Sequence, residues 1–147
     1  MFRHILLPSD GSRLAMKGVR AGVRLAKALG ARVTAVHVTP PYVPAYGEAM
    51  LYIPAVGASE HQKACERSAK KVLAAAQAEA RRAGVRCDTR TITDPQPWGA
   101  ILRLARSRKC DAIAIASHGH GALGGLILGS ETQRVLAHSR IPVLVIR

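Results

Sequence analysis

The stretch DAIAIASHGHGALGGLILGSE, residues Asp111 to Glu131, combines an apolar strand, a glycine-rich loop and the start of a helix. Five glycines fall within eleven residues of it, and glycine lets a backbone approach a ligand without a Cβ in the way. Ser130 is expected to cap the helix that follows, whose first N–H groups and positive dipole end favour an anion. The stretch is therefore either a phosphate-binding site or a mobile connector, and its local chemistry does not decide between them.

The rest of the chain alternates strands and helices around this stretch. Sequence patterns predict strands at residues 2–8, 31–38, 85–92, 111–116 and 142–147, and helices at about 14–29, 59–83, from 97, and 130–138. Strict alternation predicts an α/β domain with a parallel sheet and right-handed crossovers. Ile5, Leu6 and Leu7 run apolar without alternation, which is typical of a strand covered on both faces. Residues 85–92 alternate and predict an edge strand.

The helix boundaries are marked by local signals. Gly30 and Gly84 are expected to end the first two helices, and Pro97 to begin the third. Ser59 and Gln62 fit a capping box for the second helix.

The first helix carries two different faces. Its basic residues line one of them: Arg13, Lys17, Arg20, Arg24 and Lys27. The opposite stripe is expected to face the core: Leu14, Gly18, Ala21, Leu25 and Leu29. We interpret the basic face as a solvated exterior rather than a polyanion-binding ridge.

Composition limits the classes of function. The formal charge of +13 favours an anionic ligand without choosing among nucleic acid, anionic lipid and acidic partners. Aromatic residues are only 3% of the chain, which argues against stacking on single strands, and no nucleic-acid-binding motif appears. No apolar run is long enough to span a membrane. Cys65, Cys87 and Cys110 are widely spaced and suit a reducing, cytoplasmic location.

Several known functional motifs are either missing from the sequence or lack the context that their function requires. Residues 119–124 match G-x-G-x-x-G, but they open no long helix and no acidic residue follows at the spacing that holds a ribose. The P-loop and G-x-S-x-G patterns are missing, and His118 and His120 lack companions at metal-ligand spacing. We therefore predict no catalytic or metal-ligating residue. Asp10, at the end of the buried first strand, either accepts hydrogen bonds from a ribose or purine or caps the first helix.

The chain resembles the universal stress protein family along nearly its whole length. ILLPSDGS at residues 5–12 is similar to that family's first strand and turn, and VHV at residues 36–38 to its second strand end. ASHG, nine residues, then GS and a final IPVLVIR resemble its G-x-x-G-x9-G-[ST] signature. The resemblance implies one flavodoxin-like, Rossmann-like three-layer domain over residues 1–147, with a parallel sheet of five strands in the order 3-2-1-4-5. It also implies homodimers paired through the last strand, Pro142 to Arg147.

The resemblance also implies a site for ATP with Mg or Mn. Carried over by position, the base and ribose would contact Pro8, Ser9, Asp10 and Val38. The ribose and phosphates would contact His118, Gly119, Gly129 and Ser130. Ala116 stands where the signature has its first glycine and adds a methyl group beside the ligand. Glu131 places a carboxylate in the first helical turn, where it would either repel phosphates or stabilise the start of the helix.

We therefore expect a stress-response protein that binds ATP or a related adenine nucleotide as a regulatory ligand in a homodimer, with at most slow hydrolysis. The alternative is a dimeric interaction module of the same family that binds no nucleotide. That module would capture a protein partner through the proline- and tyrosine-rich stretch at residues 39–58.

Overall fold

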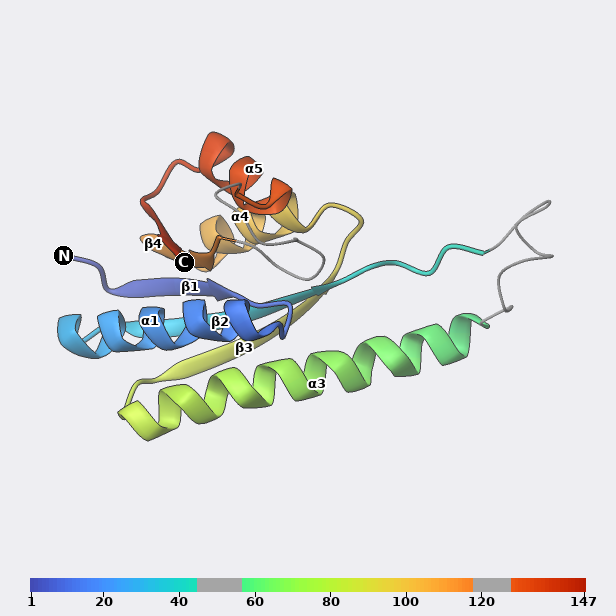
Figure 1. Ribbon diagram of the computed structural model, residues 1–147, viewed down its shortest axis with the longest axis horizontal. Helices are drawn as coiled ribbons and strands as arrows, with labels where there is room; N and C mark the ends of the chain where they lie inside the picture. Colours follow the sequence, from blue (N-terminus) through green and yellow to red (C-terminus); the bar gives the residue numbers. More distant parts are fainter. Residues whose placement is uncertain (45–56, 118–127) are drawn as a thin grey trace.

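The computed structural model describes residues 1–44, 57–117 and 128–147. One parallel sheet runs through it in the order β3-β2-β1-β4-β5 (Figure 1). The strands are β1 (His4–Pro8), β2 (Arg32–Thr39), β3 (Cys87–Thr93), β4 (Ala112–Ala116) and β5 (Val143–Ile146). The predicted flavodoxin-like order 3-2-1-4-5 is confirmed.

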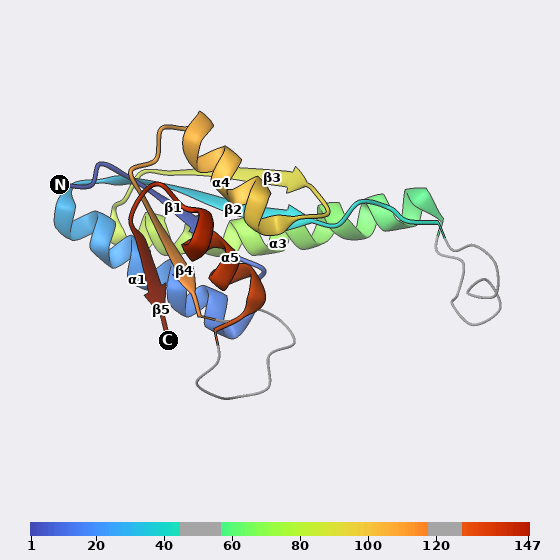
Figure 2. The same ribbon diagram turned by 90° about the horizontal axis from the view of Figure 1, so that it is seen from above.

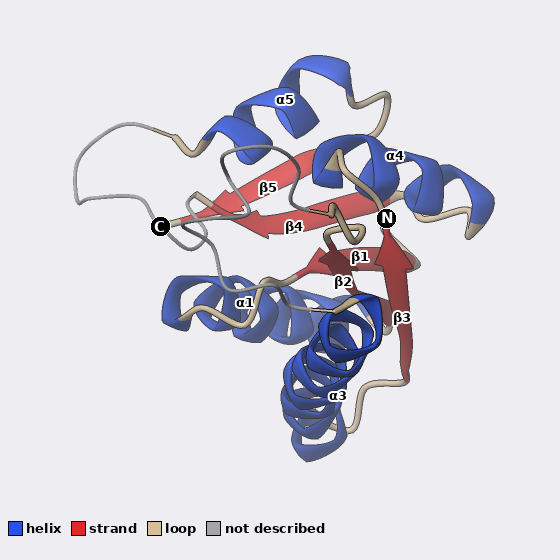
Figure 3. Ribbon diagram, turned by 90° about the vertical axis from the view of Figure 1, so that its right-hand side faces the viewer, coloured by secondary structure: helices blue, strands red, loops and turns tan. Residues whose placement is uncertain are grey.

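Helices cover both faces of this sheet. In the described ranges they are α1 (Arg13–Leu29), α3 (Ala58–Ala83), α4 (Pro97–Ser107) and α5 (Ser130–His138). Figure 3 shows α1 and α3 on one face and α4 and α5 on the other. Seen from above, α3 extends well beyond the end of the sheet, beside the chain that leaves β2 (Figure 2).

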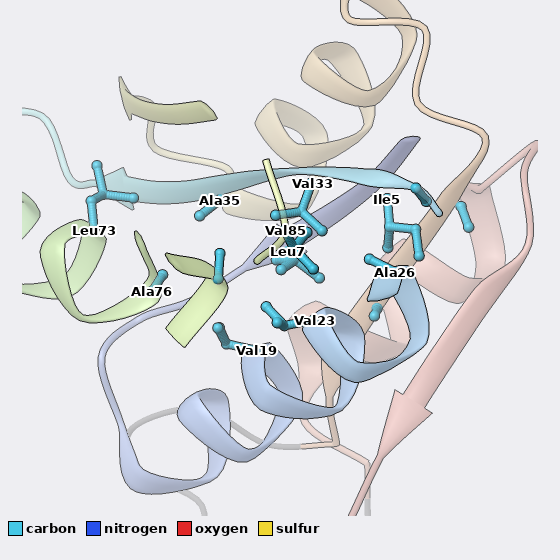
Figure 4. Close-up of a cluster of buried hydrophobic side chains, with 14 residues drawn as sticks. Ile5, Leu7, Val19, Val23, Ala26, Val33, Ala35, Leu73, Ala76 and Val85 are labelled. Atoms are coloured by element: carbon cyan, nitrogen blue, oxygen red, sulfur yellow. The ribbon is translucent and has the colours of Figure 1, made fainter. Parts of the chain in front are cut away.

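The central strand explains why two cores form. Ile5 and Leu7 pack with α1 and α3 (Figure 4), whereas Leu6 packs with α4 and α5. Because successive side chains of a strand point to opposite faces, a strand with helices on both sides needs an unbroken apolar run. β3 is partly exposed along its length, as predicted for an edge strand.

Three predicted helix boundaries are confirmed. Gly30 and Gly84 are the C-caps of α1 and α3, with φ of +65° and +71°, and Pro97 is the first residue of α4. Glycine suits these caps because it adopts a positive φ without a steric penalty.

Two predicted serine caps are wrong. The N-cap of α3 is Gly57, with helix beginning at Ala58, so Ser59 lies inside the helix. The N-cap of α5 is Gly129, and Ser130 is the first helical residue. Serine is a common cap, but the chain's path into each helix decides which residue holds the cap conformation.

The predicted core stripe of α1 is off by about one position. The basic face is exposed as expected, but Leu14, Ala21, Leu25 and Leu29 are only half-buried. The fully buried residues of α1 are Ala15, Gly18, Val19, Gly22, Val23 and Ala26. Small residues face the sheet because α1 lies very close to it, and the leucines pack along the sides of the helix.

The three cysteines all lie in described parts of the chain. Cys65, Cys87 and Cys110 are free thiols, and Cys110 is buried. Of the helices in the described ranges, none combines the length and apolarity needed to cross a membrane.

Candidate functional site

The first feature of the candidate site is the meeting of two strand ends. β1 and β4 pair in parallel, with Ile5 opposite Ala112 and Leu6 opposite Ile113. The loops that follow them therefore leave the sheet at the same edge. In open parallel sheets, ligands bind beyond this carboxyl edge, where strand order reverses. The reversal lies between β1 and β4, because the chain builds outward from β1 in one direction and from β4 in the other.

The turn after β1 is held to β2 by buried hydrogen bonds. The Ser9 N–H donates to the Val36 carbonyl at 2.9 Å, and the buried His37 ring bonds to the Ser9 carbonyl through Nδ1 at 2.9 Å. Because a carbonyl only accepts, Nδ1 carries the hydrogen. His37 thus fixes the position of Ser9. It is an anchoring residue that sequence patterns did not reveal, since its partner lies 28 residues away.

Asp10 orders the same turn but does not cap the helix. Its Oδ1 accepts from the Ser12 N–H at 2.9 Å. Ser12 is the N-cap, because its Oγ accepts from the Ala15 N–H at 3.0 Å. Gly11 between them has a φ of +82°, a conformation that side chains other than glycine's rarely adopt. The interpretation that Asp10 caps α1 is therefore wrong, because Ser12 is the N-cap.

The end of β4 holds the start of α5. The Gly129 N–H donates to the Ser117 carbonyl at 2.8 Å, and the buried Thr132 hydroxyl donates to the Ala116 carbonyl at 2.9 Å. The Ser117 N–H in turn donates to the Ile146 carbonyl of β5 at 2.7 Å. These bonds fix the N-terminus of α5 at the carboxyl edge. Within the described chain, no side chain caps α5, so its positive end is presented at this edge.

The methyl group of Ala116 is buried against α1. The residue is 4% exposed, and a Cβ built on Gly18 of α1 would lie 3.5 Å from the Ala116 Cβ. The methyl group therefore lies in the interface between α1 and β4, where the missing side chain of Gly18 makes room for it. The contact that the structure shows for this methyl group is with α1, and its placement beside a ligand stays a prediction.

Glu131 stabilises the start of a neighbouring helix. Its Oε2 accepts from the Trp98 N–H at 2.8 Å, in the first turn of α4. Gln96, the N-cap of α4, makes no side-chain capping bond, so Glu131 supplies this bond from α5. The other oxygen of Glu131 contacts Arg134 at 3.5 Å. Two interpretations of Glu131 followed from the sequence: repulsion of phosphates, or stabilisation of the start of its own helix, α5. The carboxylate does stabilise a helix start, but the helix is α4.

The described candidate residues gather at one edge of the sheet. Pro8 ends β1 opposite Val36, and Val38 lies two residues farther along β2. Ser9 is buried, Asp10 and Gly129 are half-buried, and Ser130 is exposed. His118 and Gly119 lie outside the described residues, as does most of the stretch at 39–58. Thr132 and His37 also lie at this edge, and the sequence patterns did not identify them as site residues.

Metal-ligating side chains do not cluster in the part of the chain that the structure describes. There, no three His, Cys, Asp or Glu residues are close enough to hold one ion.

A family model described as the universal stress protein family matches residues 1–147. The chain belongs to this family. A universal stress protein of Thermus aquaticus is 35% identical over 147 residues, which cover all of both chains. The solved structure of universal stress protein UspA from Lactobacillus plantarum has a TM-score of 0.81 at 25% identity, over 99% of this chain and 98% of that one.

Two further universal stress protein structures share the fold and were solved with ligands. One, in complex with cAMP, has a TM-score of 0.70 at 22% identity, over 99% of this chain and 97% of that one. The other, from Archaeoglobus fulgidus in complex with dAMP, has a TM-score of 0.69 at 19% identity, over 100% of this chain and 98% of that one.

Proposed function

We propose that this universal stress protein binds an adenine nucleotide, ATP with Mg or Mn, at the carboxyl edge of β1 and β4. The observation that carries the proposal is the position of α5. Its N-terminus is held at the end of β4 by the Gly129 and Thr132 hydrogen bonds, and no side chain in the described ranges caps it. Such a helix end binds phosphate through its N–H groups and its dipole.

The two departures from the family signature are compatible with this ligand. The Ala116 methyl group packs against Gly18, and the Glu131 carboxylate bonds to α4 and contacts Arg134. Both groups therefore have partners within the fold. The turn at Ser9 and Asp10 and the end of β2 at Val38 would hold the base and ribose, while Gly129, Ser130 and the stretch containing His118 and Gly119 would hold the phosphates. The cAMP and dAMP complexes of two structural relatives support an adenine nucleotide as the ligand class.

The nucleotide would act as a regulatory ligand of a homodimer in the cytoplasm. β5 is an edge strand, and its Leu144 is 43% exposed. Pairing with the same strand of a second copy would cover this edge and remove its tendency to aggregate. The Ser117 N–H bonds to the Ile146 carbonyl, so the loop that would hold phosphates is joined directly to the strand that would form the dimer. A ligand that favours one arrangement of this loop would thereby bias the dimer or its choice of partner.

Calorimetry with ATP and Mg, and separately with Mn, tests the ligand. Ser130→Glu adds a carboxylate at the exposed first position of α5 and should weaken ATP binding at least tenfold. Ala137→Glu adds the same charge at an exposed position near the other end of α5 and should bind like the parent protein. Absence of heat for the parent protein at millimolar ATP would reject the site and favour the interaction module. Equal binding by Ser130→Glu would place the nucleotide elsewhere.

Sedimentation tests the dimer. Leu144→Lys places a charge on the proposed interface and should give monomers. Leu136→Lys changes another leucine of comparable exposure, 39% on α5, and should leave the dimer intact. An unchanged dimer for Leu144→Lys would exclude β5 as the interface.

A further inference from the structure

The layer formed by α1 and α3 is strongly basic. The two helices lie on the same side of the sheet (Figure 3) and share one core, which includes Val19 of α1 and Leu73 of α3. α1 carries five Lys or Arg residues and no acidic residue, and α3 carries six Lys or Arg residues and three Glu residues. The basic residues of α1 alone suited a solvated exterior, but the structure places a second basic helix beside them.

Helical periodicity directs these charges away from the sheet. The basic residues of α1 are spaced by four and three, and Lys63, Arg67 and Lys70 repeat this spacing on α3. All of them are exposed, while the opposite side of each helix is buried. Residues three and four apart share one helix face. At 1.5 Å per residue, the stripe from Arg13 to Lys27 is about 21 Å long.

Few of these charges are neutralised within the protein. Glu79 of α3 lies 3.1 Å from Arg20 Nε and 2.7 Å from Arg82 Nη2, so one carboxylate pairs with two guanidinium groups and joins α3 to α1. Within residues 1–44, 57–117 and 128–147, no carboxylate forms an ion pair with Lys17 or Arg24. These cations are therefore available to an external anion, on two helices whose relative position is fixed.

The side chains of this layer select among anionic partners. Neither helix contains Phe, Tyr or Trp, and the large apolar side chains that are exposed in the described chain all lie outside α1 and α3. Bases of single strands stack on aromatic rings, and the centres of protein interfaces are enriched in aromatic anchors. Helices that lie in a lipid interface insert apolar side chains into it. The layer offers none of these contacts, so its partner must be held by charge alone.

We propose that the basic face, the exposed Lys and Arg residues of α1 and α3, binds double-stranded nucleic acid through its phosphates. A duplex carries one negative charge per about 1.7 Å of its axis, the density that a surface of closely spaced cations complements. Contacts with phosphates carry no sequence information, so binding is independent of base sequence. This agrees with the lack of a nucleic-acid-binding motif. The face uses none of the nucleotide-site residues, and the proposal does not rest on ATP binding.

Fluorescence anisotropy with a labelled mixed-sequence DNA duplex, without ATP, tests the proposal. The logarithm of the parent's binding constant should fall linearly with the logarithm of salt concentration between about 50 and 200 mM. The double variant Lys17→Gln/Arg24→Gln removes two phosphate contacts. It should reduce the steepness of this line by about two and weaken binding at low salt at least tenfold.

Two further variants separate the basic face from total charge and from folding. Arg106→Gln/Arg140→Gln makes the same change in net charge at exposed positions outside α1 and α3, and should bind like the parent. Lys17→Arg/Arg24→Lys keeps both charges and should retain binding. Equal loss in the Arg106 and Arg140 variant would show that net charge alone acts, and would overturn the proposal.

The choice of ligand decides whether a duplex is the partner. Absence of duplex binding by the parent at about 50 mM salt would overturn the proposal, because phosphate contacts are strong at low salt. Tighter binding to the single strand of the same sequence would overturn it as well. Binding to phosphatidylserine vesicles without binding to the duplex would assign the face to a membrane surface instead. Since ATP is absent throughout, failure of the nucleotide site would leave these results unchanged.

Discussion

Replacing Gly18 of α1 with alanine tests how closely this helix approaches the end of β4. The new Cβ would lie 3.1 Å from the Ala116 nitrogen and 3.5 Å from the Ala116 Cα and Cβ. The tightest of these contacts is with backbone, which cannot rotate away as a side chain can. α1 and β4 must therefore separate by a few tenths of an ångström to admit the methyl group.

The magnitude follows from two opposing effects. Alanine is favoured over glycine in a helix interior by about 1 kcal/mol. Overpacking a well-filled core costs about 1–3 kcal/mol. The free energy of unfolding should therefore fall by about 1 kcal/mol for Gly18→Ala, which corresponds to a melting temperature lower by about 3 °C in a domain of this size.

Gly99→Ala in α4 is the matched control, measured by urea unfolding alongside Gly18→Ala. The nearest atom to its new Cβ would be Arg103 Nη1, the far end of an exposed side chain whose other terminal nitrogen pairs with Asp94. This variant gains helix propensity without overpacking, so it should be neutral or stabilised. The difference between the two variants isolates the overpacking cost of about 1–3 kcal/mol. If Gly18→Ala proved as stable as Gly99→Ala, α1 would not lie against β4 as closely as described, and the account of the Ala116 methyl group would fail.

Three further predictions concern Thr132, Glu131 and His4. Thr132→Val should lower the free energy of unfolding by about 1–2 kcal/mol, because the buried Ala116 carbonyl loses its donor, and Thr132→Ser should restore most of it in the same urea titration. Glu131→Ala should cost about 0.5–2 kcal/mol by removing the cap of α4, and Glu131→Gln, which keeps an acceptor oxygen, should cost less; equal losses would deny the capping role. Burial, aided by Arg32, lowers the pKa of His4 below its ordinary 6.5, so the folded state favours the neutral ring. Its contribution to stability should be complete above pH 6.5 and decrease as the pH falls below it, and His4→Gln should flatten this part of a stability profile measured by thermal unfolding.

The amino-acid sequence by itself determined the layered fold. Ile5, Leu6 and Leu7 predicted a strand buried on both faces, and the structure places β1 at the centre of the sheet. Gly30 and Pro97 marked helix boundaries correctly. These features depend on backbone conformation or two-sided burial, which a few neighbouring residues encode. The family signature likewise lies in short stretches, so the family could be identified before the fold was seen.

Only the tertiary structure decided what individual side chains contact at the carboxyl edge. Glu131 bonds to Trp98, 33 residues away, and Gly18 makes room for Ala116 on a different element. Helical periodicity located the apolar side of α1 only to within about one position, because the spacing between helix and sheet selects small residues for the closest contact. Hydrogen-bond partners and close packing depend on elements brought together by folding, and no local pattern in the sequence records these distances.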